Sequence, residues 1–278
     1  MESSSLGARL FLIGSDASHA MSASLWNPVL EALGSAWRYE GWDVPAGASM
    51  SGVRARLLDG DVVAANITMP HKQWAAQAAD TVSEPVRLSG AANLLIGRGN
   101  GLAGFNTDVA AVAALLGDRP QRHAVILGAG GAARAALVAL RGRVLRVTVA
   151  DRDTRAATDL ASLAAGLGMA AEALPWAEAQ RQARNASLIV NATPVGKGAE
   201  DGAVWGDGAL AEDAVVYDFV YAGHVTASIA AAGRQGLPCV DGWDHLQAQA
   251  AAMVPLLGLA PEACRLLAKT LAEIRARH

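Results

Sequence analysis

Residues 123–134, which read HAVILGAGGAAR, constrain the fold of this 278-residue chain more than any other segment. An apolar run ends at Gly128, further glycines follow at Gly130 and Gly131, and an alanine-rich stretch begins at once. Strand, glycine turn and helix with the pattern G-x-G-x-x-A are typical of a dinucleotide-binding βαβ unit. Gly128 permits a sharp turn, Gly130 lets a pyrophosphate approach the backbone, and Ala133 keeps the helix close to the strand. The loop therefore predicts cofactor contacts at Gly128, Ala129, Gly130, Gly131 and Ala132.

An acidic segment follows the next expected strand, 146–150, where such a unit binds the adenosine ribose. Asp151 and Asp153 bring carboxylates that accept hydrogen bonds from free ribose hydroxyls and repel a 2′-phosphate, which favours NAD. Arg152 and Arg155 favour NADP instead, since each can pair with a phosphate or stack on adenine. The alternative for both arginines is a solvated position at the start of a helix. We expect NAD as the cofactor, NADP as the alternative, and contacts from Asp151, Arg152 and Asp153.

Short apolar runs alternate with alanine-rich stretches along the chain, which predicts an α/β fold with mainly parallel sheets. A hairpin is expected at 92–96 and 101–104, and the C-terminal part from about 246 to 277 is expected to be almost all helix. The remaining expected strands are 9–13, 61–67, 123–127, 146–150, 188–191 and 215–219. The length fits one large domain or two medium ones.

Composition excludes several functional classes. Hydrophobic residues make up 52% and the net charge is −3, so the chain can form a core and offers no basic surface to nucleic acid or an anionic membrane. Two cysteines are too few for a disulfide framework, and no His, Cys, Asp and Glu spacing predicts a metal site. The chain shows no membrane-spanning run, and residues 1–5 lack the basic region of a signal peptide, so we expect a cytoplasmic protein.

Two segments of the first half carry residues suited to proton transfer. Lys72 follows the strand 61–67 and a helix-starting Pro70, so it lies in the first turn of a helix. A cation is electrostatically disfavoured there, which suits an acid/base role, although a lysine on the surface is the simpler alternative. Asp108 begins the helix that follows residues 104–107 and either caps that helix or pairs with Lys72.

Several segments of the chain occur in the order typical of one enzyme family. They are 14–23, 66–72, 90–93, 104–108, the glycine loop, 191–196, 218–221 and 241–249. On these motifs the chain is identified as a member of the shikimate dehydrogenase family. The resemblance implies two domains: a substrate-binding and catalytic α/β domain over 1–108, joined by the C-terminal helices 241–278, and a Rossmann domain over 109–240. It also implies a monomer or homodimer acting on a small hydroaromatic acid.

The resemblance further implies reversible hydride transfer between shikimate and 3-dehydroshikimate, a step of aromatic amino acid biosynthesis. Lys72 would be the acid/base and Asp108 its partner. Ring hydroxyls would be held by Asn66, Asn93, Asp108 and Gln249, and the carboxylate by Ser22, Thr68 and Tyr221. Additional dinucleotide contacts would come from Thr193, Val220, Gly242 and His245.

The chain departs from the family pattern beside the substrate and nicotinamide. Ala20 replaces the first of two serines in the carboxylate loop, Leu94 replaces a threonine, and His245 replaces a methionine. A lost hydrogen bond to a charged group costs about 1.5–3 kcal/mol, so Ala20 predicts weaker shikimate binding or another substrate. The alternatives are a quinate/shikimate or aminoshikimate dehydrogenase-like paralogue and, in another class, a non-catalytic dinucleotide-binding sensor. The presence of both Lys72 and Asp108 favours an enzyme.

Overall fold

The computed structural model describes residues 8–277, and residues 1–5, on which the signal-peptide prediction depends, lie outside them. The described chain divides into two compact units, 8–107 with 249–277 and 108–248. The chain leaves the first unit after Thr107 and returns at Gln249, within helix α10 (Gly242–Leu256). The return therefore lies inside a helix, a few residues beyond the position 241 expected from the sequence.

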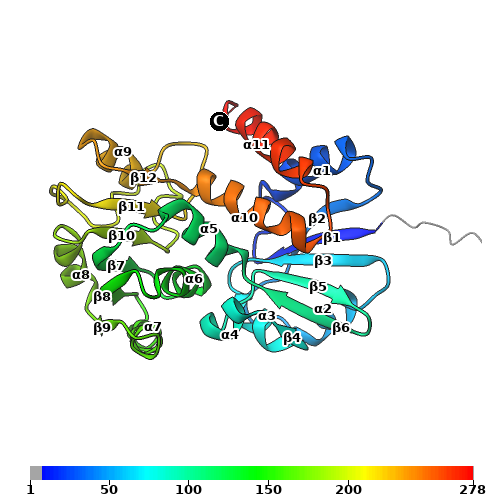
Figure 1. Ribbon diagram of the computed structural model, residues 1–278, viewed down its shortest axis with the longest axis horizontal. Helices are drawn as coiled ribbons and strands as arrows, with labels where there is room; N and C mark the ends of the chain where they lie inside the picture. Colours follow the sequence, from blue (N-terminus) through cyan, green and yellow to red (C-terminus); the bar gives the residue numbers. More distant parts are fainter. Residues whose placement is uncertain (1–7, 278) are drawn as a thin grey trace, which may run out of the picture. The chain divides into compact units, whose positions relative to one another are not determined.

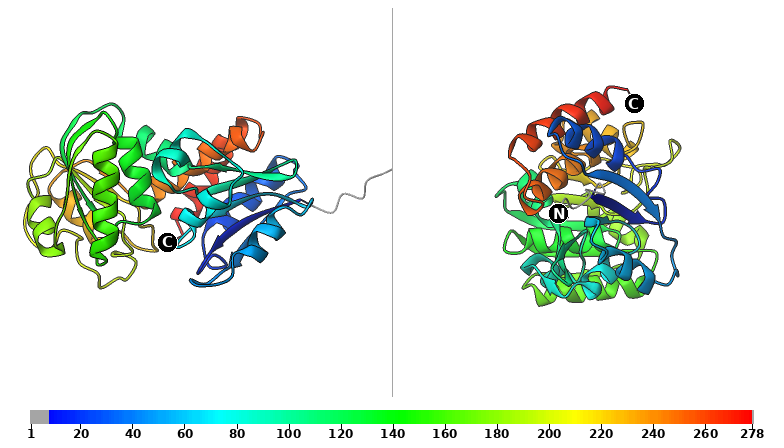
Figure 2. Two further views of the ribbon diagram at one scale, coloured as in Figure 1. Left: turned by 90° about the horizontal axis from the view of Figure 1, so that it is seen from below. Right: turned by 90° about the vertical axis from the view of Figure 1, so that its right-hand side faces the viewer.

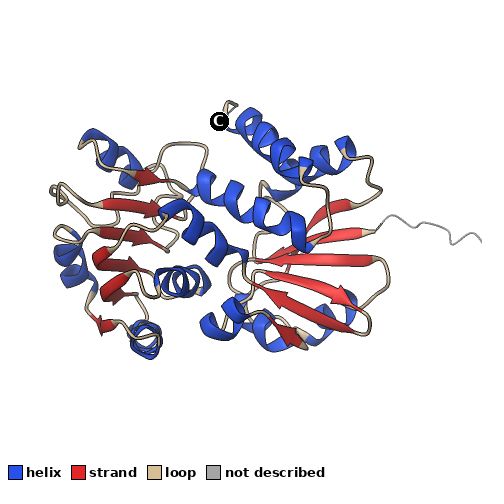
Figure 3. Ribbon diagram, in the orientation of Figure 1, coloured by secondary structure: helices blue, strands red, loops and turns tan. Residues whose placement is uncertain are grey.

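The first unit is built on a sheet of six strands. They are β1 (Arg9–Gly14), β2 (Arg38–Asp43), β3 (Val62–Ile67), β4 (Thr81–Val82), β5 (Leu94–Arg98) and β6 (Gly101–Phe105). Their order is β2-β1-β3-β5-β6-β4, and among these strands only β5 runs antiparallel to its neighbours. Strands β5 and β6 form the hairpin expected at 92–96 and 101–104. Figure 3 shows this sheet in red between its helices.

Helices cover both faces of this sheet (Figures 1 and 2). The helices are α1 (Ser22–Ala32), α2 (Ser51–Leu57), α3 (Lys72–Ala78), α4 (Glu84–Ser89) and α11 (Glu262–Arg275). Helices α1 and α11 pack together on one face. On the other face, Val53, Ala75 and Val86 from α2, α3 and α4 join a core with Phe11 and Ile13 of β1. Strands β1 and β3 are buried along almost their whole length, so apolar layers cover both faces of the sheet there.

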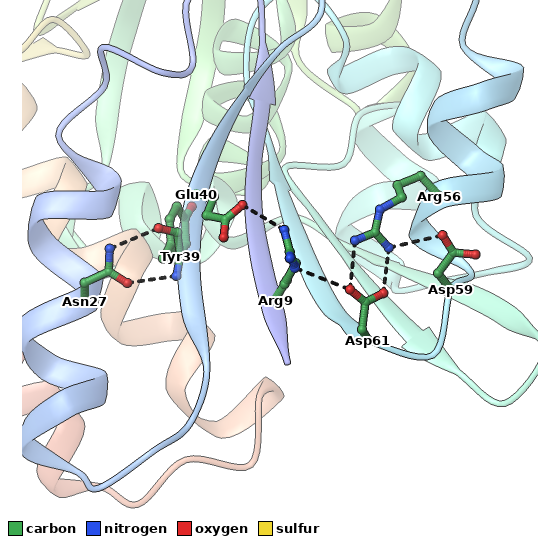
Figure 4. Close-up of polar contacts among 7 residues, drawn as sticks. All are labelled: Arg9, Asn27, Tyr39, Glu40, Arg56, Asp59 and Asp61. Carbon is green, nitrogen blue, oxygen red and sulfur yellow. Dashed lines mark hydrogen bonds and ion pairs between the residues drawn. The ribbon is translucent and has the colours of Figure 1, made fainter. Parts of the chain in front are cut away.

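A row of charges lies at the amino-terminal ends of β1, β2 and β3 (Figure 4). Arg9 pairs with Glu40 at 3.3 Å and with Asp61 at 3.4 Å, and Arg56 holds Asp61 through two hydrogen bonds of 2.7 and 2.9 Å. The hydrogen bonds from Arg56 lower the pKa of the Asp61 carboxyl. Because these side chains are solvent-exposed to a considerable degree, their contribution to stability is small.

The second unit contains an entirely parallel six-stranded sheet. Its strands are β7 (Gln121–Leu127), β8 (Val144–Ala150), β9 (Ala170–Ala173), β10 (Leu188–Asn191), β11 (Val215–Asp218) and β12 (Cys239–Val240). The order β12-β11-β10-β7-β8-β9 makes the chain turn back between β7 and β10. Ligands of open α/β sheets bind beyond the carboxyl ends of the strands at such a reversal. The sequence predicted four of these strands. Strand β12 has only two residues, and β9, with the sequence AAEA, lacks the branched apolar residues that mark β10 and β11.

Helices also cover both faces of the second sheet (Figure 1). They are α5 (Thr107–Leu116), α6 (Gly131–Leu140), α7 (Thr154–Gly166), α8 (Trp176–Ala183) and α9 (Ala227–Arg234). Ala133, Ala135 and Ala136 of α6 are fully buried, and such small side chains allow a helix to approach its sheet closely. Within residues 8–277, no helix has the length and apolar character needed to cross a membrane.

Candidate active site

The glycine loop after β7 has the geometry that its sequence predicts. Gly128 has φ +105°, and a Cβ placed there would lie 2.6 Å from the carbonyl oxygen of Ala192. It would also lie 3.1 Å from the Cγ2 atom of Thr193, so the loop passes directly beside the segment that follows β10. Only glycine tolerates both the left-handed backbone and this close approach. The loop and Thr193 therefore lie together at the reversal of strand order.

Gly130 differs from Gly128 because a Cβ there would meet nothing within 4 Å. The space beside Gly130 is open, and α6 begins at the next residue, Gly131, with its first backbone N–H groups unpaired within the helix. These donors and the helix dipole favour an anion. The residues present thus fit the pyrophosphate of a dinucleotide.

Asp151 joins the end of β8 to the glycine loop. One of its carboxylate oxygens accepts the backbone N–H of Ala129 at 2.8 Å, and the other accepts the N–H of Asp153 at 2.9 Å. The side chain of Asp153 caps α7 by accepting the N–H groups of Arg155 and Ala156 at 2.9 and 3.2 Å. The Arg152 side chain is exposed beside them. Two carboxylates therefore lie where the adenosine ribose of a bound dinucleotide is expected.

A buried polar network ties the carboxyl ends of β10 and β11 together. Asn191 donates to Asp218 at 2.8 Å and accepts from the hydroxyl of Thr193 at 2.6 Å. Asp218 also accepts the N–H of Val220 at 3.0 Å and the hydroxyl of Thr226 at 2.7 Å. Burial raises the pKa of the Asp218 carboxyl, and these hydrogen bonds oppose that rise. The network holds Thr193 and Val220, two expected cofactor contacts, at one edge of the sheet.

The start of α10 lies against the segment that follows β11. A Cβ on Gly242 would lie 2.3 Å from the backbone of Val220 and 2.5 Å from the nitrogen of Tyr221, so only glycine fits. The ring of Tyr221 packs against Trp243, with 5.6 Å between centroids. Val220, Gly242 and Tyr221 are thus neighbours within the second unit.

Asp108 and His245 form a buried pair in the second unit. The Nε2 atom of His245 lies 3.2 Å from an Asp108 oxygen, and its Nδ1 atom lies 2.7 Å from the hydroxyl of Tyr217. The imidazole also packs against the ring of Phe219 at 4.5 Å between centroids. Burial and the charge of Asp108 raise the pKa of Tyr217 far above its usual range, so its hydroxyl keeps its proton. Tyr217 was not predicted as a site residue, because a tyrosine within an apolar strand has the pattern of an ordinary core residue.

The first unit links three of the expected hydroxyl-binding residues, Asn66, Asn93 and Gln249, in one hydrogen-bonded cluster. Asn93 donates to the Thr107 hydroxyl at 2.9 Å and accepts its N–H at 2.8 Å, and that hydroxyl donates to Gln249 at 3.3 Å. Asn66 donates to the backbone oxygen of Asn93 at 3.2 Å. These amides come from β3, from the residue before β5 and from α10. Their convergence presents neutral hydrogen-bonding groups suited to a polyhydroxylated ligand.

Tyr39 and Met253 orient the amide of Asn66 and were not predicted as site residues. Tyr39 donates to the side-chain oxygen of Asn66 at 2.7 Å, and the Asn66 nitrogen lies 3.3 Å from the sulfur of Met253. The side chain of Asn27 binds both backbone groups of Tyr39, at 2.8 and 3.0 Å, and fixes the position of this tyrosine (Figure 4). The sequence offers one indication of this role, namely that Tyr39 is an aromatic residue between the charged residues Arg38 and Glu40.

Thr68 lies beside the start of the loop 14–23. A Cβ on Gly14 would lie 2.2 Å from the Cγ2 atom of Thr68, and the N–H of Ser15 binds the oxygen of Met69 at 3.1 Å. Ser22 is buried at the first turn of α1, where this loop ends. The loop thus brings the regions of Ser22 and Thr68 into one part of the fold.

Lys72 is the first residue of α3, as predicted, and is partly buried. Its backbone oxygen accepts the N–H of Ala92 at 2.8 Å, which places it beside the segment that carries Asn93. Lys72 belongs to the first unit and Asp108 to the second, so their pairing stays a prediction. Among residues 8–277, no group of three His, Cys, Asp or Glu side chains has a metal-binding arrangement.

Comparison with known proteins identifies the family. Residues 12–95 match the model of the shikimate dehydrogenase substrate binding domain. A shikimate dehydrogenase (NADP(+)) of Methylobacterium radiotolerans is 37% identical over 252 residues, which cover 87% of this chain and 88% of the relative. The chain belongs to the shikimate dehydrogenase family.

Solved structures of this family have the same two-domain α/β fold. Quinate dehydrogenase from Corynebacterium glutamicum, in complex with NAD, aligns with a TM-score of 0.83 at 28% identity, covering 96% of this chain and 99% of that one. Shikimate 5-dehydrogenase from Thermus thermophilus, in complex with NADP(H) and shikimate, aligns with a TM-score of 0.75 at 30% identity, covering 95% and 99%. The expected fold class, an N-terminal substrate domain and a Rossmann domain, is confirmed. The comparisons support a nicotinamide dinucleotide as the cofactor. They do not support the expected preference for NAD, because the names of the shikimate dehydrogenases among these relatives favour NADP.

Proposed function

We propose that this protein catalyses the reversible, nicotinamide dinucleotide-dependent oxidation of shikimate to 3-dehydroshikimate. The observation that carries the proposal is the cluster of Asn66, Asn93 and Gln249, in which Asn93 and Gln249 bind Thr107 and Asn66 binds the backbone of Asn93. It offers neutral donors and acceptors to ring hydroxyls and discriminates against analogues that leave them unpaired. The 37% sequence identity with a shikimate dehydrogenase, over 87% of this chain, supports the same activity.

The proposed reaction divides hydride and proton between different acceptors. The bound nicotinamide supplies the acceptor for the hydride that leaves C3 of the acid. Lys72 takes the proton of the C3 hydroxyl, and Asp108 assists by sharing that proton. The C3–H and O–H bonds break, a carbonyl forms, and one reduced dinucleotide and one proton result. In the reverse direction Lys72 donates the proton to the carbonyl oxygen.

We assign the remaining predicted residues to binding. Ser22, Thr68 and Tyr221 hold the carboxylate, and the glycine loop with Thr193, Val220 and Gly242 holds the dinucleotide. We propose NAD as the preferred dinucleotide, because the carboxylates of Asp151 and Asp153 repel a 2′-phosphate. The NADP-dependent relatives favour NADP, and Arg152 and Arg155 offer charges that would accommodate its phosphate.

A paralogue acting on quinate or aminoshikimate is the second candidate. It is favoured by Ala20, which removes a hydroxyl from the loop 14–23, and by the NAD-bound quinate dehydrogenase among the similar structures. The loop 14–23 keeps its position without a hydroxyl at residue 20, because Ser18 donates to Asp43 through its N–H at 2.8 Å and through its hydroxyl at 2.5 Å. These bonds lower the pKa of the Asp43 carboxyl and keep it charged.

The purified protein is assayed with shikimate, quinate and aminoshikimate, each in combination with NAD and with NADP. Formation of the reduced nicotinamide is followed by its absorbance. The proposal predicts the highest kcat/KM for shikimate, and a higher value for quinate or aminoshikimate would establish the paralogue instead. Dinucleotide binding without turnover of any acid would contradict both and favour a sensor.

A further inference from the structure

We propose that His245 is a positioning residue that holds the carboxylate of Asp108 through a directed hydrogen-bond chain from Tyr217. The inference depends on the proposed role of Asp108 in catalysis. It gives His245 a role different from the dinucleotide contact expected from the sequence, because both of its ring nitrogens have protein partners within 3.2 Å. Only the carbon atoms of the ring remain for a contact with nicotinamide.

The direction of the chain follows from the chemistry of its ends. A carboxylate only accepts hydrogen bonds, so the Nε2 atom that faces Asp108 at 3.2 Å must carry the hydrogen. In the neutral imidazole the Nδ1 atom is then an acceptor, and the Tyr217 hydroxyl at 2.7 Å donates to it. Tyr217 is fully buried and its hydroxyl stays protonated, which makes it a reliable donor. The result is the order Tyr217 O–H, His245 N–H, Asp108 carboxylate.

The surroundings fix the imidazole in this orientation. His245 is 7% exposed, Asp108 is 3% exposed, and Tyr217 is fully buried, so water does not compete for these bonds. The ring is packed by Phe219 at 4.5 Å and by Tyr217 at 5.9 Å between centroids, at angles of 59° and 76°. Three elements contribute: β11 provides Tyr217, α10 provides His245 and α5 provides Asp108.

A positioned carboxylate matters because Asp108 must share a proton in a defined direction. The hydrogen bond from His245 to one oxygen restricts rotation of the Asp108 side chain and so defines the direction of its other oxygen. Loss of such positioning costs on the order of 100-fold in rate when the reacting geometry shifts by about 1 Å. A methionine at this position, as in the family pattern, fills space but donates no hydrogen bond.

The first test reads the tautomer directly and does not depend on activity. The protein is labelled with 15N-histidine, and long-range 15N–1H spectra are recorded; the signals of His245 are assigned by their loss in His245→Met. We expect the neutral Nε2–H tautomer in wild type and a change of tautomer balance in Tyr217→Phe. An Nδ1–H tautomer, or a ring protonated on both nitrogens, in wild type would overturn the proposal.

The second test separates positioning from folding. His245→Met is expected to lower kcat on the order of 100-fold with KM for the dinucleotide unchanged. His245→Gln, whose amide N–H can replace the Nε2–H group, is expected to recover at least tenfold of that loss. Gln247→Ala, an exposed change on the same helix, serves as the control with unchanged kcat. Equal kcat in His245→Met and wild type, or no difference between the Met and Gln variants, would overturn the inference.

Asp108→Asn distinguishes this inference from the proposed function. If Asp108→Asn abolishes turnover while His245→Met retains it, the proposed function stands and the positioning role is wrong. If Asp108→Asn retains full turnover, the catalytic role of Asp108 is wrong. The proposed effect of His245 on the rate is then wrong as well, because it acts through Asp108. Thermal unfolding of each variant verifies that the comparison is made between folded proteins.

Discussion

The carboxylate of Asp151 accepts the backbone N–H of Ala129 at 2.8 Å and thereby links the end of β8 to the glycine loop after β7. The proposed preference for NAD rests on repulsion between this carboxylate and a 2′-phosphate. Its effect on the loop and its effect on cofactor choice can be separated, because asparagine retains a side-chain oxygen that accepts the same N–H group.

Asp151→Asn is therefore expected to lower the preference for NAD over NADP by about tenfold, which corresponds to about 1.4 kcal/mol of removed repulsion. The measurement is the ratio of kcat/KM for the two dinucleotides with a fixed acid. Asp153→Ser retains a helix-capping oxygen and tests the second charge separately. An unchanged ratio in both variants would mean that Arg152 or Arg155 determines the choice.

The two glycines of the loop are expected to respond differently to alanine. Gly128→Ala forces a left-handed backbone and a clash with Ala192, and should lower the free energy of unfolding by about 1–3 kcal/mol or more. Gly130→Ala has an ordinary φ of −81° and meets no protein atom, so stability should remain within about 0.5 kcal/mol. Its dinucleotide affinity should nevertheless fall at least about tenfold, because the new methyl group occupies the open space.

Denaturant unfolding and dinucleotide titration of both glycine variants measure these effects. Wild-type affinity in Gly130→Ala would show that the pyrophosphate binds elsewhere.

Tyr39→Phe should lower the free energy of unfolding by about 1–3 kcal/mol, since the buried oxygen of Asn66 loses its donor. The phenyl ring still stacks on Trp26 at 6.3 Å between centroids, so the change removes the hydroxyl alone. KM for the acid should also rise, because the Asn66 amide is no longer held in one orientation. A double-mutant cycle with Asn66→Leu measures the coupling, and a coupling energy near zero would contradict the role assigned to this bond.

Much of the fold followed from local patterns, and the missing parts have physical reasons. The strand before Gly128 and the helix after it were predictable, because glycine, apolar runs and alanine-rich stretches act over a few residues. Strand β2 was not predicted, since Arg38, Glu40 and Asp43 give it an exposed, charged pattern. The domain return inside α10 cannot be read from composition, because a helix that passes between two units keeps one continuous pattern.

The candidate site likewise contains residues that local motifs predicted and residues that they did not. Residues that lie in short motifs, such as Lys72 and Asn93, were candidates from the sequence. Tyr39 and Tyr217 act on residues 27 and 28 positions away, at Asn66 and His245, and only the folded sheets bring them into contact. Their roles come from tertiary hydrogen bonds that no local pattern records.

Ala20→Ser restores the hydroxyl expected in the loop 14–23 and distinguishes the two candidate substrates. If shikimate is the substrate, its KM should fall by roughly 10-fold or more, since a hydrogen bond to a charged group contributes about 1.5–3 kcal/mol. Steady-state kinetics with shikimate and quinate measure the change, with Ser24→Ala at an exposed position of α1 as the control. A higher KM for shikimate would indicate that the loop has adapted to a different group.

The central claim is that a shikimate-type acid transfers hydride to a nicotinamide dinucleotide while Lys72 moves the proton. The most direct measurement is the rate of nicotinamide reduction by shikimate in wild type and in Lys72→Ala, with dinucleotide affinity measured in the same samples. Lys269→Ala, an exposed lysine on α11 paired with Glu273 at 4.0 Å, is the matched control. The account predicts turnover in wild type and the control, and at least about 100-fold slower turnover in Lys72→Ala with unchanged dinucleotide affinity. Equal turnover in Lys72→Ala, or no reduction by the wild-type protein with any of the three acids, would contradict it.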